Sequence, residues 1–198
     1  FNSITMFYIN DSCEESIRKT IDAQTADILV GLKTITSKET LKQYIIDHKD
    51  SLDRLTSVAE ISEERFKRMV SMIRKDRGFV FATEWGLSKI RSAMMESPAM
   101  MESVLNLIWD GKHDPKMQAC IPPFYLENMA MDDSTLAKIQ DEGSVRQLVK
   151  RGLEGTYSNM IGDAILADIE KELKRVCAKH GLEYQKNVRV SKLDRAVS

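Results

Sequence analysis

Proline, glycine and cysteine are scarce in this sequence, with 4, 9 and 3 of them in 198 residues. So few turn formers and helix breakers argue against a β-sandwich, a linker array or a disordered chain. Cys13, Cys120 and Cys177 are far apart and lack metal-type spacing, so we expect reduced thiols in a cytoplasmic protein. No apolar run approaches the length that crosses a bilayer, so we expect no membrane partner.

Neither sign of charge dominates, since 29 Lys and Arg face 30 Asp and Glu. The net charge therefore does not favour binding to a polyanion such as DNA. A local basic face is still possible, because acidic residues elsewhere would cancel it in the net charge. The histidines His48, His113 and His180 are isolated, and no second cluster completes a tetrahedral metal site. The sequence also has no glycine-rich phosphate loop, dinucleotide fingerprint or nucleophile elbow. These absences leave ordinary nucleotide-driven chemistry without a visible site.

Most of the chain has the apolar spacing of amphipathic helices. Ser97 before Pro98 is typical of a helix start, and Gly78 is typical of a helix end. Residues 112–123, which contain three of the four prolines, predict an irregular connection and a possible internal boundary. The predicted helices cover 12–33, 36–45, 52–58, 62–77, 87–94 and 97–111, followed by two short helices that begin at Ser134 and Ser144.

The pattern changes after this helical region. Residues 152–158 contain two glycines and predict a loop. Ser158 or Asn159 is a suitable cap for a following long helix, which we expect to end at Gly181. Residues 182–190 alternate in character and predict a strand. The sequence therefore predicts a long helix that leads directly into a strand.

Three features of the sequence offer binding surfaces, and each has a structural explanation beside it. The predicted helix over 62–77 carries six basic residues, which either face phosphates or form a solvated surface. Lys150 and Arg151 precede the predicted loop and the start of a helix, an arrangement suited either to a phosphate or to a plain capped loop. Met94, Met95, Met100 and Met101 suit an adaptable protein-binding surface or a core.

Residues 151–187 contain a Gly-Leu loop, an Asn/Ser stretch, Gly162-Asp163-Ala164, a long helix, Gly181-Leu182-Glu183-Tyr184 and a basic strand. In this order they resemble type II restriction endonucleases of the PD-(D/E)XK superfamily, most closely the group that cuts at GATC. Such enzymes place a helical region before a nuclease core, which begins with a helix and continues with strands that carry carboxylates and a lysine. The resemblance implies a mainly α fold, with a multi-helix region over 1–151 and the first helix and strands of an α/β restriction-endonuclease-like core over 152–198.

The resemblance also implies a site. The family's core helix usually offers Gly-x-x-x-Glu, but Leu166 holds the matching position after Gly162, so Asp163 or Glu170 would substitute from the same helix face. Asp194 resembles the family's first catalytic Asp. The implied roles are catalysis by Asp194, Mg²⁺ binding by Asp163, Glu170 and Asp194, and contacts to double-stranded DNA by Lys150, Arg151 and Asn159. A homodimer would match the symmetry of a two-stranded site.

The family's downstream Glu-x-Lys strand does not occur before Ser198. Metal-dependent phosphodiester hydrolysis needs carboxylates from two strands around Mg²⁺, so we expect the catalytic portion to be truncated from this sequence. Two other functions stay open. A non-enzymatic helical DNA-binding or regulatory module would use residues 62–77, and a protein-interaction scaffold would use residues 94–101. DNA binding without cleavage would indicate the first, and a partner-dependent change in size would indicate the second.

Overall fold

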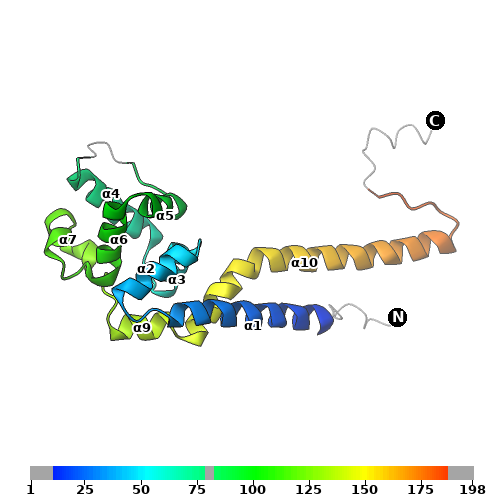
Figure 1. Ribbon diagram of the computed structural model, residues 1–198. Helices are drawn as coiled ribbons and strands as arrows, with labels where there is room; N and C mark the ends of the chain where they lie inside the picture. The colour runs from blue at the N-terminus through cyan, green and yellow to red at the C-terminus, as the bar shows by residue number, and fades with distance from the viewer. Residues whose placement is uncertain (1–10, 79–82, 187–198) are drawn as a thin grey trace. The chain divides into compact units, whose positions relative to one another are not determined.

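The computed structural model describes residues 11–78 and 83–186 (Figure 1). Within these ranges it contains ten α-helices and no β-strand. In chain order the helices are α1 (Asp11–Lys33), α2 (Lys38–Asp47), α3 (Ser51–Val58), α4 (Glu63–Asp76), α5 (Leu87–Glu96), α6 (Pro98–Asp110), α7 (Pro115–Cys120), α8 (Pro123–Leu126), α9 (Asp133–Ile139) and α10 (Glu142–Lys179).

The predicted α/β core is wrong, because the described residues are all-helical outside their turns and loops. Residues 182–186 of the predicted strand are not extended into a sheet, and residues 187–190 lie outside the described ranges. A strand needs a neighbouring extended segment to satisfy its backbone groups. Alternation of side-chain character alone was therefore insufficient evidence for a strand.

The predicted loop over 152–158 is also wrong, since these residues lie inside α10. Asp141 caps this helix, because its Oδ2 accepts hydrogen bonds from the Ser144 amide at 2.8 Å and the Ser144 hydroxyl at 3.0 Å. No proline follows Pro123, and each interior glycine costs only about 1 kcal/mol relative to alanine. The helix therefore continues through Gly152 and Gly155 and has no new N-terminus at Asn159.

The end of α10 agrees with the prediction. Gly181 has a φ of 66°, and the Leu182 amide donates to the Cys177 carbonyl at 2.8 Å. A glycine tolerates this left-handed conformation, and the backbone bond satisfies a carbonyl that the helix leaves open. Gly78 ends α4 in the same way, with a φ of 94° and its amide bonded to the Lys75 carbonyl.

The chain divides into two compact units at positions inside α1 and α10. Unit 2 consists of residues 18–152, and unit 1 consists of residues 1–17 and 153–198. Only 11–17 and 153–186 of unit 1 are described.

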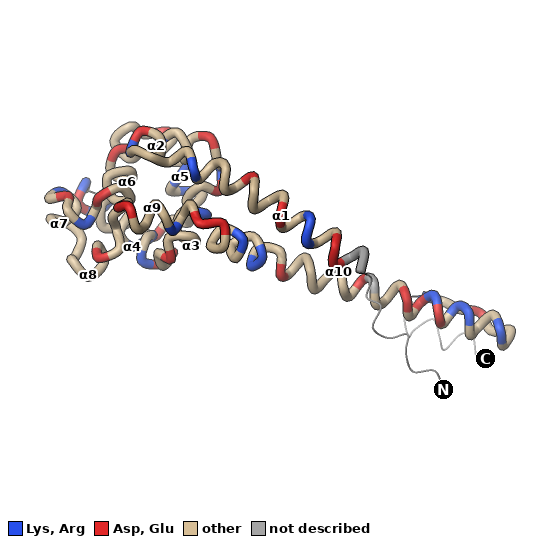
Figure 2. The backbone as a smooth tube through the Cα atoms, turned by 90° about the horizontal axis from the view of Figure 1, so that it is seen from below, with Lys and Arg blue, Asp and Glu red and all other residues tan. Residues whose placement is uncertain are grey.

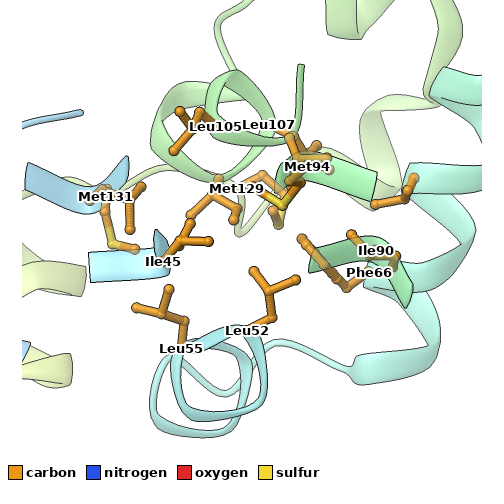
Figure 3. Packing of buried hydrophobic residues seen from close by; sticks show 14 of the residues in the cluster. Ile45, Leu52, Leu55, Phe66, Ile90, Met94, Leu105, Leu107, Met129 and Met131 are labelled. Carbon is orange, nitrogen blue, oxygen red and sulfur yellow. The ribbon is translucent and has the colours of Figure 1, made fainter. Parts of the chain in front are cut away.

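Unit 2 contains the hydrophobic core. Figure 3 shows Ile45, Leu52, Phe66 and Met94 converging from four different helices, and each is at most 2% exposed. The helix starts predicted at Ser62 and Ser97 are confirmed, since each hydroxyl accepts a backbone amide of the first turn. The helix predicted from residue 36 is capped by Ser37, and the helix predicted from Ser134 is capped by Asp132. Local capping therefore sets the helix ends, and the shared apolar stripes set their packing.

Residues 112–123 are more regular than predicted. Asp114 caps α7, with its Oδ1 accepting the Lys116 amide at 2.9 Å, and Pro115 occupies the first turn, where its missing amide costs nothing. Met117 and Ile121 are buried in the unit 2 core. The prolines of this segment start short helices instead of preventing them.

The described part of unit 1 has few buried side chains. Figures 1 and 2 show the first turns of α1 alongside the part of α10 that begins unit 1. Ile17 is 6% exposed there, and Leu153, Tyr157 and Ile161 of α10 are half-buried. Among the described residues, no helix is both long and apolar enough to cross a membrane.

Candidate functional site on helix α10

Glu170 lies at the centre of a charged cluster in unit 1, which we call the Glu170 cluster. Its members are Glu170, Lys174, Tyr184 and Lys186. The Glu170 Oε1 atom is 2.9 Å from the Lys174 Nζ atom, and Oε2 accepts a hydrogen bond from Lys186. Lys174 also lies 5.6 Å from the centre of the Tyr184 ring. Because Gly181 turns the backbone after α10, residues 182–186 fold back toward Glu170.

The two lysines control the protonation of this cluster. Their hydrogen bonds, with Lys174 contributing most, lower the pKa of Glu170 to about 2. In return, Glu170 raises the pKa of Lys186, and the charge of Asp163 acts in the same direction. Glu170 is thus a carboxylate and Lys186 an ammonium ion at neutral pH. Neither group is poised to transfer a proton there.

Two of the three predicted metal ligands, Asp163 and Glu170, lie within the described residues. Asp163 and Glu170 are seven residues apart on α10, which separates them by about 10 Å along the helix axis. Both residues belong to one helix, and the Glu170 carboxylate is paired with Lys174 and Lys186. No group of three potential metal ligands occurs among the described side chains. Asp194 lies outside the described ranges.

The predicted DNA-binding residues are all solvent-exposed on α10. Lys150 and Arg151 belong to unit 2, whereas Asn159 belongs to unit 1. The Arg151 Nε atom donates to the Gln147 carbonyl at 3.4 Å, one turn earlier in the helix. Because α10 is continuous here, its backbone amides are already bonded within the helix. The argument for a phosphate at a helix N-terminus therefore does not apply to these residues.

The basic residues of α4 make contacts inside unit 2. Arg74 is 7% exposed, lies 3.4 Å from the centre of the Trp85 ring and donates to the Thr83 carbonyl at 2.6 Å. Arg68 pairs with Glu84, and Arg65 lies 4.3 Å from the centre of the Phe124 ring. These contacts stabilise the packing around α4. Arg68 and Lys75 nevertheless remain exposed, so α4 keeps part of its basic surface.

The methionines of α5 and α6 fill the core. Met94, Met100 and Met101 are 1%, 7% and 6% exposed, and only Met95, at 47%, faces solvent. The prediction that these methionines pack in the core is therefore confirmed for three of the four residues. A binding surface over residues 94–101 would need a rearrangement of the core.

Unit 2 also contains a cavity of about 540 Å³ that the sequence did not indicate. Trp109 lines it, together with an Asp110–His113 pair at 2.7 Å and a Glu60–Lys138 ion pair. Side chains of both signs line this cavity, and two of its acidic side chains are paired. Its electrostatics therefore select neither an anion nor a cation.

Sequence reasoning identified Glu170 but missed its partners. The Glu170–Lys174 spacing of four residues was a usable signal, because such residues are neighbours on one helix face. Lys186 and Tyr184 had no comparable signal, since their approach to Glu170 depends on the turn after α10.

Comparison with known proteins gives no relative: no family model, no curated protein and no solved structure matches this chain.

Proposed function

We propose that this chain is part of a type II restriction endonuclease, which hydrolyses phosphodiester bonds in double-stranded DNA in a metal-dependent manner. The observation that carries the proposal is the resemblance of residues 151–187 to the group that cuts at GATC. In the proposed enzyme two copies act on the two strands of a symmetric site. Such a protein works in the cytoplasm, where cellular DNA is found.

One structural fact supports this proposal over the protein-interaction scaffold. Met94, Met100 and Met101 are buried, which weakens that rival surface, whereas Lys150, Arg151 and Asn159 are exposed on α10. Arg68 and Lys75 of α4 remain exposed, so the DNA-binding module has to be distinguished by experiment.

Lys150, Arg151 and Asn159 are the proposed DNA contacts because they are exposed. The lysine and arginine would neutralise phosphates, and the asparagine would add a neutral hydrogen bond. Mg²⁺ enters the proposal through the resemblance alone. Asp194 lies outside the described ranges, so we assign no catalytic step to Asp163 or Glu170.

Cleavage of unmethylated plasmid DNA tests the proposed function. We expect the protein from the full-length gene to produce discrete fragments when Mg²⁺ is present and none when it is chelated. Asp194→Ala should abolish cleavage while DNA binding persists. Glu39→Gln is a suitable control, because Glu39 is an exposed acidic residue of α2 and not of the proposed site.

DNA affinity separates the proposed enzyme from a binding module. Replacing both Lys150 and Arg151 with alanine should weaken binding to every DNA sequence. The slope of log affinity against log salt concentration should fall by the amount expected for about two phosphate contacts. Lys171→Ala, at an exposed site elsewhere on α10, is the matched control. Intact plasmid under all metal conditions would contradict the nuclease proposal, and salt-dependent binding without cleavage would indicate a DNA-binding module.

A further inference from the structure

The last part of α10 exposes a row of large apolar side chains, which we call the α10 stripe. It consists of Leu166, Ile169, Leu173 and Val176, which are between 39% and 61% exposed. Ile165 borders it and is 41% exposed. A single exposed leucine needs no explanation, but a contiguous apolar patch on a soluble helix marks an interaction surface.

The spacing of the α10 stripe indicates its mode of packing. Its residues follow at intervals of three, four and three, which are the a and d positions of a heptad. That pattern keeps one seam facing a partner helix. An identical seam on a second copy has the same spacing, so two copies related by a two-fold axis can interdigitate.

The charges beside the α10 stripe suit a protein partner of the same kind. Glu172 pairs with Arg175 at 2.6 Å on one flank, and Glu170 pairs with Lys174 at 2.9 Å on the other. Figure 2 shows both signs interleaved along this end of α10. Helices that bind anionic membranes or DNA carry mainly basic residues on the polar face. A surface of mixed sign does not repel its own copy.

We infer that the α10 stripe is the contact between two copies of this chain. The choice of a second copy rests on the proposed function, in which two copies act on one DNA site. The contact consists of five side chains on one helix, whereas standard complexes use about 20–30 residues on each side, so we expect a weak dimer.

Sedimentation velocity of the full chain tests this inference. From about 1 μM to about 200 μM, the wild-type protein should shift from monomer to dimer. Leu173→Glu and, independently, Leu166→Glu should each weaken the dimer by at least about tenfold, because a charge replaces an apolar side chain in the seam. Val30→Glu is the matched control, since Val30 is 69% exposed on α1 within unit 2.

Circular dichroism of each variant should remain helical, which confirms that the substitutions act at the surface. A wild-type protein that stays monomeric throughout would overturn the inference. So would protection of the α10 stripe from hydrogen exchange in that monomer, which would indicate that the chain covers its own stripe. Equal weakening by Val30→Glu would also overturn it. A protein that forms the dimer but does not cut DNA would contradict the proposed function and support this contact. A protein that cuts DNA but stays monomeric would support the nuclease activity and contradict this contact.

Discussion

The helices of unit 2 and the α10 stripe of unit 1 have the same kind of apolar spacing. In unit 2 the apolar side chains are buried, whereas in the α10 stripe they are exposed to solvent. Leu107 on α6 is 0% exposed, whereas Leu166 on α10 is 61% exposed. Both are leucines within helices whose apolar residues recur every three or four positions. The difference teaches that periodicity predicts a helix and its apolar face, while the presence of other elements decides whether that face becomes a core.

The largest expected effect comes from removing the same side chain in each environment. Leu107→Ala should lower the free energy of unfolding by about 2–5 kcal/mol, because it leaves a cavity among packed side chains. Leu166→Ala should change it by no more than about 0.5 kcal/mol. Urea unfolding at a concentration where the protein is monomeric measures both. Similar losses for the two variants would show that the α10 stripe is covered within the monomer.

A smaller effect should follow from the loss of a polar contact in unit 2. The Arg91 guanidinium donates to the Ile45 and Ile46 carbonyls at 2.9 and 2.8 Å, at the end of α2. Arg91→Met keeps the apolar stem but should cost about 1–3 kcal/mol, since both bonds to the charged group are lost. Chemical unfolding provides the measurement, with Lys42→Met on the exposed side of α2 as control. An equal loss of unfolding free energy in the control would show that these two hydrogen bonds make no net contribution to stability.

The continuity of α10 can be tested at its glycines. Gly152→Ala and Gly155→Ala should each stabilise the protein by about 0.5–1 kcal/mol, because alanine favours a helix and its Cβ meets no atom within 4 Å. Gly181→Ala should instead destabilise it by about 1 kcal/mol, since φ is 66° there. Thermal unfolding and helical circular dichroism distinguish the outcomes. Destabilisation at residues 152 and 155 would support the loop that the sequence predicted.

The smallest expected effect is the pH dependence of the Glu170 cluster. The folded pKa of Glu170 is lowered from 4.5 to about 2, so its contacts stabilise the fold-back of residues 182–186 above pH 4.5. As the pH falls from 4.5 toward 2, protonation should progressively remove this stabilisation. Nuclear magnetic resonance of the Tyr184 ring should follow the release. Glu170→Gln should abolish this transition, whereas Glu154→Gln should retain it; an unchanged transition in Glu170→Gln would assign it to another group.

The helices of unit 2 were largely predictable because their signals are local. Ser97 and Pro98 specify a helix start through a hydroxyl cap and a preset φ, and Gly78 specifies an end through its positive φ. The glycines of residues 152–158 gave a misleading local signal. The cost of a glycine inside a helix is small enough that the rest of α10 outweighs it.

The candidate site was less predictable than the fold. Glu170 and Lys174 are neighbours by helical spacing, but the approach of Lys186 requires the chain to reverse after Gly181. Asp163 shares a face with Glu170, yet the Glu170 carboxylate is paired with two lysines. Shared periodicity therefore identified candidates without establishing a site.

By itself, the sequence determined where most helices form and which faces are apolar, because caps, glycines and side-chain spacing act over a few residues. Only the tertiary structure decided that Leu107 is buried, that Arg74 stacks on Trp85 and that Glu170 meets Lys186. These contacts join segments that are distant in sequence. The free energy of such packing cannot be predicted from a local sequence pattern. For the same reason, the sequence pattern predicts the apolar face of the α10 stripe but not its partner, which we infer to be a second copy.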